Sequence, residues 1–153
     1  MIREAANEDI PELLRLLKQV NNVHAEGRPD LFIMDCTKYT AKELEELLRE
    51  KDKRVFVYPA GQGIKGYAFT VLEEYSMNNL VEHKTLYIDD ICVDENCRGQ
   101  HVGTALYEHV INYARELGCY NVTLNVWSKN PAARSFYDAM GMHPYKTCME
   151  TIL

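Results

Sequence analysis

The sequence predicts a single α/β domain in which helices flank a mixed sheet. Some segments carry apolar residues every three or four positions, and others alternate apolar with polar residues. These segments follow one another in the order ααβββαβαβ, the mixture expected of one α/β domain. At 153 residues, without a Pro- or Gly-rich linker, the chain is expected to form one domain over residues 1–153.

Two helices are predicted near the start of the chain. Asn7 is suited to cap the first, with Pro11 in its first turn. The residues at helical spacing in this segment are Ile10, Leu13, Leu14, Leu17 and Val20. Residues 24–39 lack a clear period and are interpreted as a loop or broken helix. Thr40 and Glu43 then form a capping box, which predicts the start of the second helix.

Strands and two further helices are predicted in the rest of the chain. The β-rich segments are residues 54–58, 64–72, 84–93, 121–127 and 145–153. A turn at residues 59–63 joins the first two into a hairpin. One helix is predicted over residues 103–117, with Gly118 as its end signal. Another is predicted over residues 131–140 and closed by Gly141.

Composition excludes several classes of partner. The net charge of −6 argues against nonspecific nucleic-acid binding. The five cysteines are odd in number and form no C-x-x-C pair, which indicates reduced thiols in the cytoplasm. The five histidines lack the spacing of a metal motif, so no metal is expected. No signal peptide opens the chain and no apolar run approaches the roughly 20 residues that span a bilayer, so no membrane association is predicted.

A basic, glycine-bearing turn joins the strand at 84–93 to the helix that follows. The start of a helix presents unpaired backbone N–H groups and a positive dipole end, which together favour an anion such as a diphosphate. The turn is not a P-loop, since no lysine follows Gly103, and it lacks the G-x-G-x-x-G dinucleotide pattern. Taken alone, it also fits a tight connection without a ligand.

A second motif, about thirty residues further on, gives the turn a more specific meaning. It reads N-P-A-A-R-S-F-Y from Asn130 to Tyr137, followed by Met140-Gly141. Together the two motifs resemble the GNAT (Gcn5-related) N-acetyltransferase superfamily, and the resemblance covers essentially the whole chain. It implies a mostly antiparallel mixed sheet with a splayed cleft between the strands at 84–93 and 121–127. One departure is His101, which stands at a glycine position of the family's loop. A side chain there fits a right-handed helix start but not a positive φ.

The resemblance implies acetyl-CoA as the bound cosubstrate. Its pyrophosphate is expected on the backbone amides of the turn, which are those of Arg98, Gly99, Gln100, His101, Val102, Gly103 and Thr104. The pantetheine arm is expected to pair with the strand backbone at Ile91, Cys92 and Val93. The side chain of Asn130 is expected to contact the cofactor.

The resemblance also implies the catalytic groups. Tyr137 matches the family's general acid, which protonates the departing CoA thiolate, although an aromatic side chain beside Phe136 also fits a core position. Alkyl amines are mostly protonated at pH 7, so a carboxylate base is expected as well. Asp89 and Asp90 are neighbours on one strand and are predicted to point to opposite faces, with only one in the cleft. The run YIDDICV resembles the corresponding strand of diamine acetyltransferases and favours Asp89, with Asp90 next.

Further residues are predicted to line the acceptor side. Asn125 stands where ribosomal-protein alanine acetyltransferases have a glutamate, and because an amide cannot act as a base, a protein N-terminus becomes a weaker acceptor without being excluded. The other candidate contacts on this side are Glu73, Trp127, His24 and Phe32.

The sequence therefore predicts an acetyl-CoA-dependent N-acetyltransferase. The expected acceptor is the primary amine of a small molecule, polyamine- or aminoglycoside-like, which attacks directly in a ternary complex without a cysteine nucleophile. The alternatives are acetylation of a protein or peptide at its N-terminus or at lysine, and an acyl-CoA-binding module without catalysis. Residues 146–153 are suited to pair across a homodimer.

Overall fold

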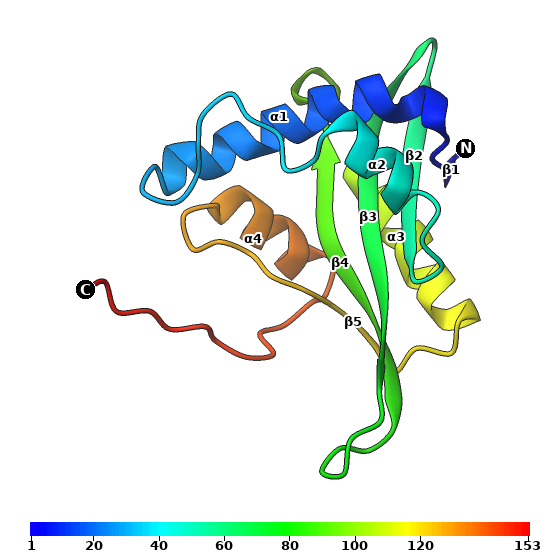
Figure 1. The fold of residues 1–153 in the computed structure, drawn as a ribbon, viewed down its shortest axis with the longest axis vertical. Coiled ribbons are helices and arrows are strands. Elements are labelled where there is room, and N and C mark those ends of the chain that lie inside the picture. Colours follow the sequence, from blue (N-terminus) through cyan, green and yellow to red (C-terminus); the bar gives the residue numbers. More distant parts are fainter.

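The computed structural model describes all 153 residues and contains one five-stranded sheet (Figure 1). The strands lie in the sheet in chain order: β1 (Arg3–Glu4), β2 (Lys53–Ala60), β3 (Gly63–Tyr75), β4 (His83–Val93) and β5 (Asn121–Leu124). Neighbours run antiparallel except β4 and β5, which run parallel. The predicted α/β class with a mixed, mostly antiparallel sheet is confirmed.

Helices cover both faces of the sheet. The elements are α1 (Ile10–Gly27), α2 (Ala41–Leu47), α3 (Val102–Glu116) and α4 (Pro131–Ala139), with short 3-10 turns η1 (Asn7–Asp9) and η2 (Glu95–Cys97). Alternation along β2 feeds two cores, because Val55 and Val57 pack with α1 and α2 while Phe56 packs with α3. Phe136 of α4 packs against the α3 core. None of the helices is both long and apolar enough to cross a membrane.

The first helix starts later and ends later than predicted. Asn7 does not cap it, because residues 7–9 form η1 and α1 begins at Ile10. Pro11 lies in the first turn, as predicted. The helix continues through Gly27, since Ala25 remains buried on its apolar side, so only the later part of residues 24–39 is a loop. The capping box of Thr40 and Glu43 is confirmed at the start of α2.

β4 and β5 are paired over only four residues. Thr85–Ile88 pair with Asn121–Leu124, and β4 then continues to Val93 with no strand on that side. The predicted strand over 121–127 therefore ends at Leu124, because residues 125–127 have no neighbour with which to pair. The two strands separate beyond this point, as the predicted splay requires.

Residues 143–153, called the arm below, do not form the strand predicted over 145–153. Their backbone takes part in no backbone–backbone hydrogen bond. Tyr145, near the start of the arm, lines a pocket with residues of α3 and β5. In Figure 1 the C-terminal end of the arm extends away from the sheet. The prediction is wrong for this chain on its own, because a strand requires a neighbouring strand and none lies beside the arm.

Candidate active site

A β-bulge decides where the two aspartates of β4 point. Along the β3–β4 pairing, Asp90 lies opposite Phe69 and Ile88 lies opposite Thr70, so Asp89 is the extra residue. The predicted opposite orientation of Asp89 and Asp90 is wrong, because the extra residue shifts the alternation by one. Asp90 shares its face with Phe69, which belongs to the core under α1 and α2, and Asp89 contacts the loop between those helices.

Asp90 is a half-buried carboxylate with one phenolic partner. The hydroxyl of Tyr67, a fully buried residue, donates to Asp90 Oδ2 at 2.5 Å. Burial raises the pKa of Asp90 to about 6, although the Tyr67 hydrogen bond acts in the opposite direction. Asp90 is therefore a carboxylate that can exchange a proton near neutral pH.

Asp89 already holds a primary ammonium group. Lys38 Nζ lies 2.7 Å from Asp89 Oδ2, and the Tyr39 hydroxyl donates to the same oxygen at 3.3 Å. Burial lowers the pKa of the Lys38 ammonium, but its contact with Asp89 outweighs burial and the net pKa is raised. A pocket of about 160 Å³ adjoins this ion pair. Its lining residues are Tyr39, Leu47, Lys53, Phe69, Thr70, Val71 and Asp89.

The hydroxyl of Tyr137 is free and lies near Asp90 and Cys92. The Asn130 side chain accepts from the N–H of Ala133 at 3.2 Å and so caps α4, which carries Tyr137. Phe136, beside it, lies against the start of α3, where a Cβ at Gly103 would be 3.4 Å from its ring. Burial, and then the negative charge of Asp90, raise the pKa of Tyr137, whose hydroxyl has no hydrogen-bond partner in the chain. Tyr137 therefore keeps its proton and can donate it.

The turn before α3 is a row of unused backbone donors. The first backbone bond of the helix runs from the N–H of Ala105 to the carbonyl of His101, so the N–H groups from Arg98 to Thr104 have no acceptor in the chain. Gly99 (φ 74°) and His101 (φ 59°) are both left-handed. Such alternation of backbone hand makes an anion-binding concavity, here at the positive end of α3. The expectation that position 101 must be right-handed is wrong, since histidine is among the residues that tolerate this region.

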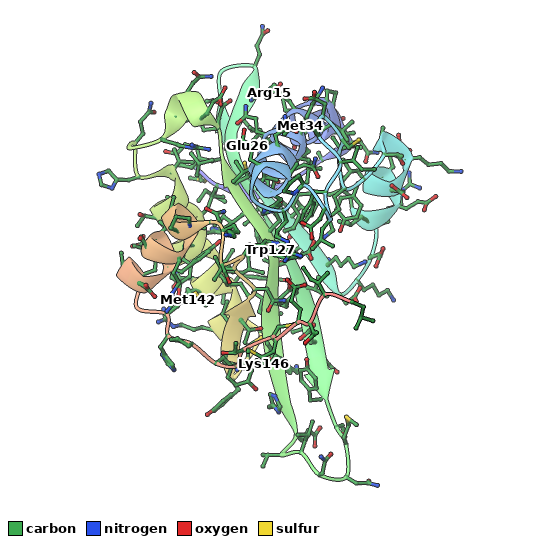
Figure 2. All side chains as sticks on the ribbon, turned by 90° about the vertical axis from the view of Figure 1, so that its left-hand side faces the viewer. Arg15, Glu26, Met34, Trp127, Met142 and Lys146 are labelled. Atoms are coloured by element: carbon green, nitrogen blue, oxygen red, sulfur yellow. The ribbon has the colours of Figure 1, made fainter.

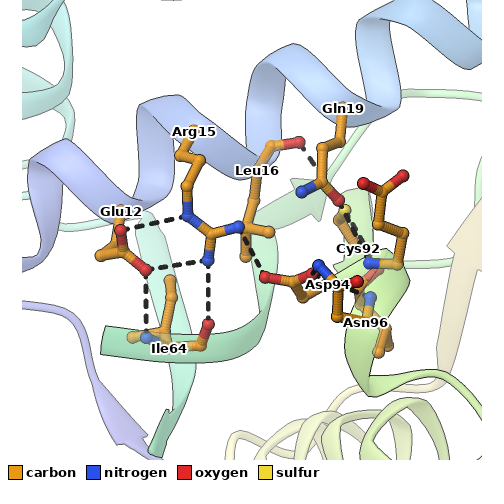
Figure 3. Close-up of polar contacts among 10 residues, drawn as sticks. Glu12, Arg15, Leu16, Gln19, Ile64, Cys92, Asp94 and Asn96 are labelled. Atoms are coloured by element: carbon orange, nitrogen blue, oxygen red, sulfur yellow. Dashed lines mark hydrogen bonds and ion pairs between the residues drawn. The ribbon is translucent and has the colours of Figure 1, made fainter. Parts of the chain in front are cut away.

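Contacts with α1 hold the start of this turn in place (Figure 3). Arg15 bonds to Asp94 at 2.5 Å and to Glu12 at 2.8 Å, which links α1 to the residue that follows β4. The side chain of Gln19 accepts from the N–H of Glu95 at 3.2 Å. Because Arg15 and Gln19 lie one turn apart on α1, the path from β4 into the turn before α3 is fixed from one side.

Cys92 is a core thiol rather than a nucleophile. It is buried, and its Sγ donates to the carbonyl of Leu16 at 3.7 Å. Burial raises the pKa of the Cys92 thiol to about 12, so the thiol is neutral at physiological pH. Direct transfer without a cysteine is consistent with this state.

The structure brings three of the predicted acceptor-side residues together. The ring centroids of His24 and Phe32 are 5.1 Å apart, and those of Phe32 and Trp127 are 5.3 Å apart. Figure 2 labels Trp127 below the end-on view of α1. Burial lowers the pKa of His24, whose buried Nδ1 has no hydrogen-bond partner.

The other two acceptor-side candidates lie apart from this aromatic cluster. Asn125 donates to the Tyr87 hydroxyl at 3.1 Å, which places it over β4. Glu73 accepts from the Tyr75 hydroxyl at 2.7 Å, further along β3 and opposite Thr85. Whether these residues contact an acceptor stays a prediction.

Lys38 and Tyr67 are site residues that the sequence analysis missed. Tyr67 could have been found, because it lies two positions from Phe69 on β3 and therefore on the same face as Asp90. Lys38 lies in a loop without periodicity, and no sequence signal places it on Asp89. No group of three or more His, Cys, Asp or Glu side chains is placed to hold a metal ion, and the expectation of no metal stays a prediction.

Comparison with known proteins identifies the family. The sequence pattern of the acetyltransferase (GNAT) family matches residues 13–142. This chain belongs to the GNAT family. The predicted class of enzyme, an N-acetyltransferase, is confirmed at this level.

Similar proteins extend over the whole fold. A mutant of the BH1408 protein from Bacillus halodurans is 30% identical, covers 100% of this chain and 99% of that chain, and superposes with a TM-score of 0.95. The bovine (Bos taurus) thialysine N-epsilon-acetyltransferase is 24% identical over 155 residues, which span 92% of this chain and 82% of that protein. An aminoglycoside N-acetyltransferase in complex with CoA, 17% identical, has a TM-score of 0.74 over 100% of this chain and 98% of its own, and shares the fold.

Proposed function

We propose that this GNAT enzyme transfers the acetyl group of acetyl-CoA to a primary alkyl amine by direct attack in a ternary complex. The observation that carries the proposal is the Lys38 ammonium on Asp89, 2.7 Å away, because it is a primary alkyl amine bound beside Asp90. An acceptor amine that replaces Lys38 would meet the same carboxylate. The name of the bovine relative, a thialysine N-epsilon-acetyltransferase, is consistent with such an acceptor.

The turn from Arg98 to Thr104 fits the diphosphate of acetyl-CoA. It offers consecutive backbone N–H groups without acceptors, the positive end of α3 and the Arg98 side chain. β4 from Asp89 to Val93 lacks a neighbour on the β5 side, which leaves Ile91, Cys92 and Val93 suited to pair with pantetheine. Bound there, acetyl-CoA supplies the thioester. The aminoglycoside relative was crystallised with CoA, which supports this cosubstrate.

Each of three side chains has one role in the proposed reaction. Asp89 binds and orients the acceptor ammonium. Asp90, with its pKa of about 6, takes the proton that the amine must lose before or during attack on the thioester carbonyl. Tyr137, whose pKa is raised, gives its proton to the sulfur as the carbon–sulfur bond breaks. The nitrogen gives its second proton to the Tyr137 phenolate as the acetamide forms, and Asp90 releases its proton to solvent. The products are an acetamide, the CoA thiol and one proton.

The same contact leaves a second candidate acceptor. Lys38 is itself a lysine side chain, so the lysine of a peptide presents the same group to Asp89.

The five cysteines are all free, which fits a reducing compartment such as the cytoplasm.

The proposal is tested by thiol release from acetyl-CoA with a panel of acceptors, with each product identified by its mass. The panel contains an alkyl diamine, thialysine, an aminoglycoside, and peptides with either a free lysine or a free N-terminus. Turnover on the alkyl amines supports the proposal. Binding of CoA without thiol release on any acceptor would instead identify an acyl-CoA-binding module.

Variants of the ion pair locate the acceptor. Lys38→Met removes the internal competitor and is expected to lower the KM of the amine by about tenfold with kcat retained, which corresponds to about 1.4 kcal/mol. Asp89→Asn should raise that KM by at least as much. Lys42→Met, at an exposed position on α2, is the matched control and should change neither constant. Equal KM values for wild type, Lys38→Met and Asp89→Asn would place the acceptor elsewhere.

A further inference from the structure

Lys38 is the only lysine that contacts a carboxylate of the site. Its Nζ lies 2.7 Å from Asp89 Oδ2, and its side chain is 51% exposed. It lies in the loop between α1 and α2, outside any helix or strand. Lys53, which lines the pocket beside Asp89, is instead paired with Glu50 at 2.8 Å. Lys38 therefore presents the same chemical group as the proposed acceptor, at the same carboxylate.

The surroundings of Lys38 place its amine beside the open stretch of β4. Asp89, which holds the amine, is the bulged residue at the point where β4 loses its pairing with β5. The positive charge of Lys38 lowers the pKa of Asp90 and that of His24, so both side chains lie near it. The ring centroid of His24 is 6.3 Å from that of Trp127, which follows β5. The amine is therefore close to both carboxylates of β4 and to the aromatic cluster beside the segment after β5.

The proposed position of acetyl-CoA brings its thioester to the same place. Ile91–Val93 are suited to pair with the pantetheine arm, and Tyr137, the proposed proton donor to the sulfur, lies near Asp90. A thioester that these groups act on lies beside Asp90. When no acceptor is bound, Lys38 is then the primary amine that the site itself holds next to the acyl donor. Holding an amine and an acyl donor side by side turns a bimolecular step into an effectively unimolecular one.

We propose that Lys38 is a site of self-acetylation, to which the enzyme transfers the acetyl group of its own bound acetyl-CoA when no acceptor occupies Asp89. Asp90 takes one proton from the ammonium, the nitrogen bonds to the thioester carbonyl carbon, and the carbon–sulfur bond breaks. Tyr137 gives its proton to the sulfur and regains one from the nitrogen, and Asp90 releases its proton to solvent. The products are acetylated Lys38, the CoA thiol and one proton. This inference rests on the proposed function and adds a modification of the enzyme itself.

Acetylation of Lys38 releases Asp89 for the acceptor. The acetamide of the modified side chain is uncharged, so the ion pair with Asp89 is lost and the half-exposed side chain is free to turn into water. Asp89 keeps the Tyr39 hydroxyl at 3.3 Å and meets the acceptor ammonium without an internal competitor. Each chain is modified once, whereas an acceptor turns over repeatedly. Self-acetylation therefore converts a chain with an occupied acceptor carboxylate into one in which that carboxylate is free.

Mass spectrometry that resolves each lysine, during incubation with saturating acetyl-CoA and no acceptor, tests the modification. Lys38 is expected to be acetylated at least about tenfold faster than Lys42 and Lys51, exposed lysines that report uncatalysed acetylation from solution. The fraction of Lys38 modified per minute should not depend on protein concentration, because the transfer occurs within one chain. Acetylation of Lys38 at the rate of Lys42, or at a rate that rises with protein concentration, overturns the proposal.

Tyr137→Phe, prepared in parallel, separates self-transfer from chemical acetylation. The rate at Lys38 should fall by about 10²-fold while Lys42 keeps its rate, because only the first reaction uses a proton donor. The same difference is expected in any acetyl groups that the purified proteins already carry. Acetylation of Lys38 that persists in a Tyr137→Phe chain without turnover on amines overturns the proposal.

Lys38→Arg tests the release of Asp89, because a guanidinium keeps the positive charge and is not acetylated. After incubation with acetyl-CoA, the wild type should have the low amine KM of Lys38→Met, whereas Lys38→Arg should keep a higher one. An acetylated wild type with the KM of Lys38→Arg overturns the release. Turnover on amines by a chain whose Lys38 stays unmodified overturns this inference alone. Thiol release neither with an amine nor onto Lys38 overturns the proposed function as well.

Discussion

Asp89 and Asp90 are adjacent carboxylates with different surroundings. Asp89 meets the Lys38 ammonium and the Tyr39 hydroxyl, whereas Asp90 accepts from the hydroxyl of buried Tyr67. One is therefore suited to bind a cation and the other to exchange a proton. This pair of roles on one face depends on a single extra residue in β4. A regular strand would have placed one of the two aspartate side chains on the α3 face.

The raised pKa of Asp90 predicts a pH-dependent stability. With a pKa of about 6 in the folded protein and 3.8 when unfolded, Asp90 binds more protons in the folded state between these values. Stability therefore falls as pH rises through this window, and the ionised group costs the folded protein about 3 kcal/mol above it. Asp90→Asn keeps an acceptor for Tyr67 and should remove this loss.

The check on Asp90 is chemical denaturation of both proteins at pH 4.5 and pH 7.5. Wild type minus variant isolates Asp90 from carboxylates such as Asp9 and Glu12, whose lowered pKa values act in the opposite direction. The variant should gain in stability relative to wild type as the pH rises. A difference that is constant with pH would contradict the assignment.

At the scale of elements, β4 is positioned by the close approach of β3 and α3. Gly66 makes this approach possible, because a Cβ there would lie 2.6 Å from the carbonyl oxygen of Cys92 and 3.0 Å from Leu106. Any larger side chain pushes β3 away from β4 and from α3. The site residues of β4 depend on this packing, since they have no strand on their other side beyond Ile88.

Gly66→Ala is expected to lower the free energy of unfolding by about 1–3 kcal/mol, because overpacking forces the backbone to move. Gly103→Ala, in the first turn of α3, meets only ordinary contacts at 3.4 Å and should leave stability unchanged or slightly higher. Urea denaturation of both variants measures the difference. Equal free energies of unfolding for the two variants would contradict the close packing of β3 against β4 and α3 at Gly66.

Some helix ends could be predicted from the sequence, whereas the limits of strand pairing could not. The capping box at Thr40 and the end of α3 at Gly118 are local signals, and both predictions agree with the structure. The early end of β5 and the unpaired arm could not be read locally, because a strand exists only where another chain segment lies beside it. The bulge at Asp89 also has no local sequence signal, since it depends on the register in which β4 pairs with β3.

At the scale of the molecule, the site combines groups from distant parts of the chain. The turn before α3 supplies backbone donors, β4 supplies the carboxylates, α4 supplies Tyr137, and the loop after α1 supplies Lys38. The sequence analysis singled out the turn and Tyr137 because each lies in a short motif that resembles the family's. Their roles in acetyl transfer stay predictions. Lys38, which marks the proposed acceptor position, lies in the loop between α1 and α2, which has no such pattern.

The most direct test of the account compares wild type with Tyr137→Phe for two quantities, the affinity for CoA and the rate of thiol release from acetyl-CoA with a primary amine. The variant keeps the ring that packs beside Phe136 and loses only the proton donor. The account predicts unchanged CoA affinity and a rate lower by about 10²-fold or more, the usual contribution of a general acid. An unchanged rate of acetyl transfer in Tyr137→Phe would contradict it.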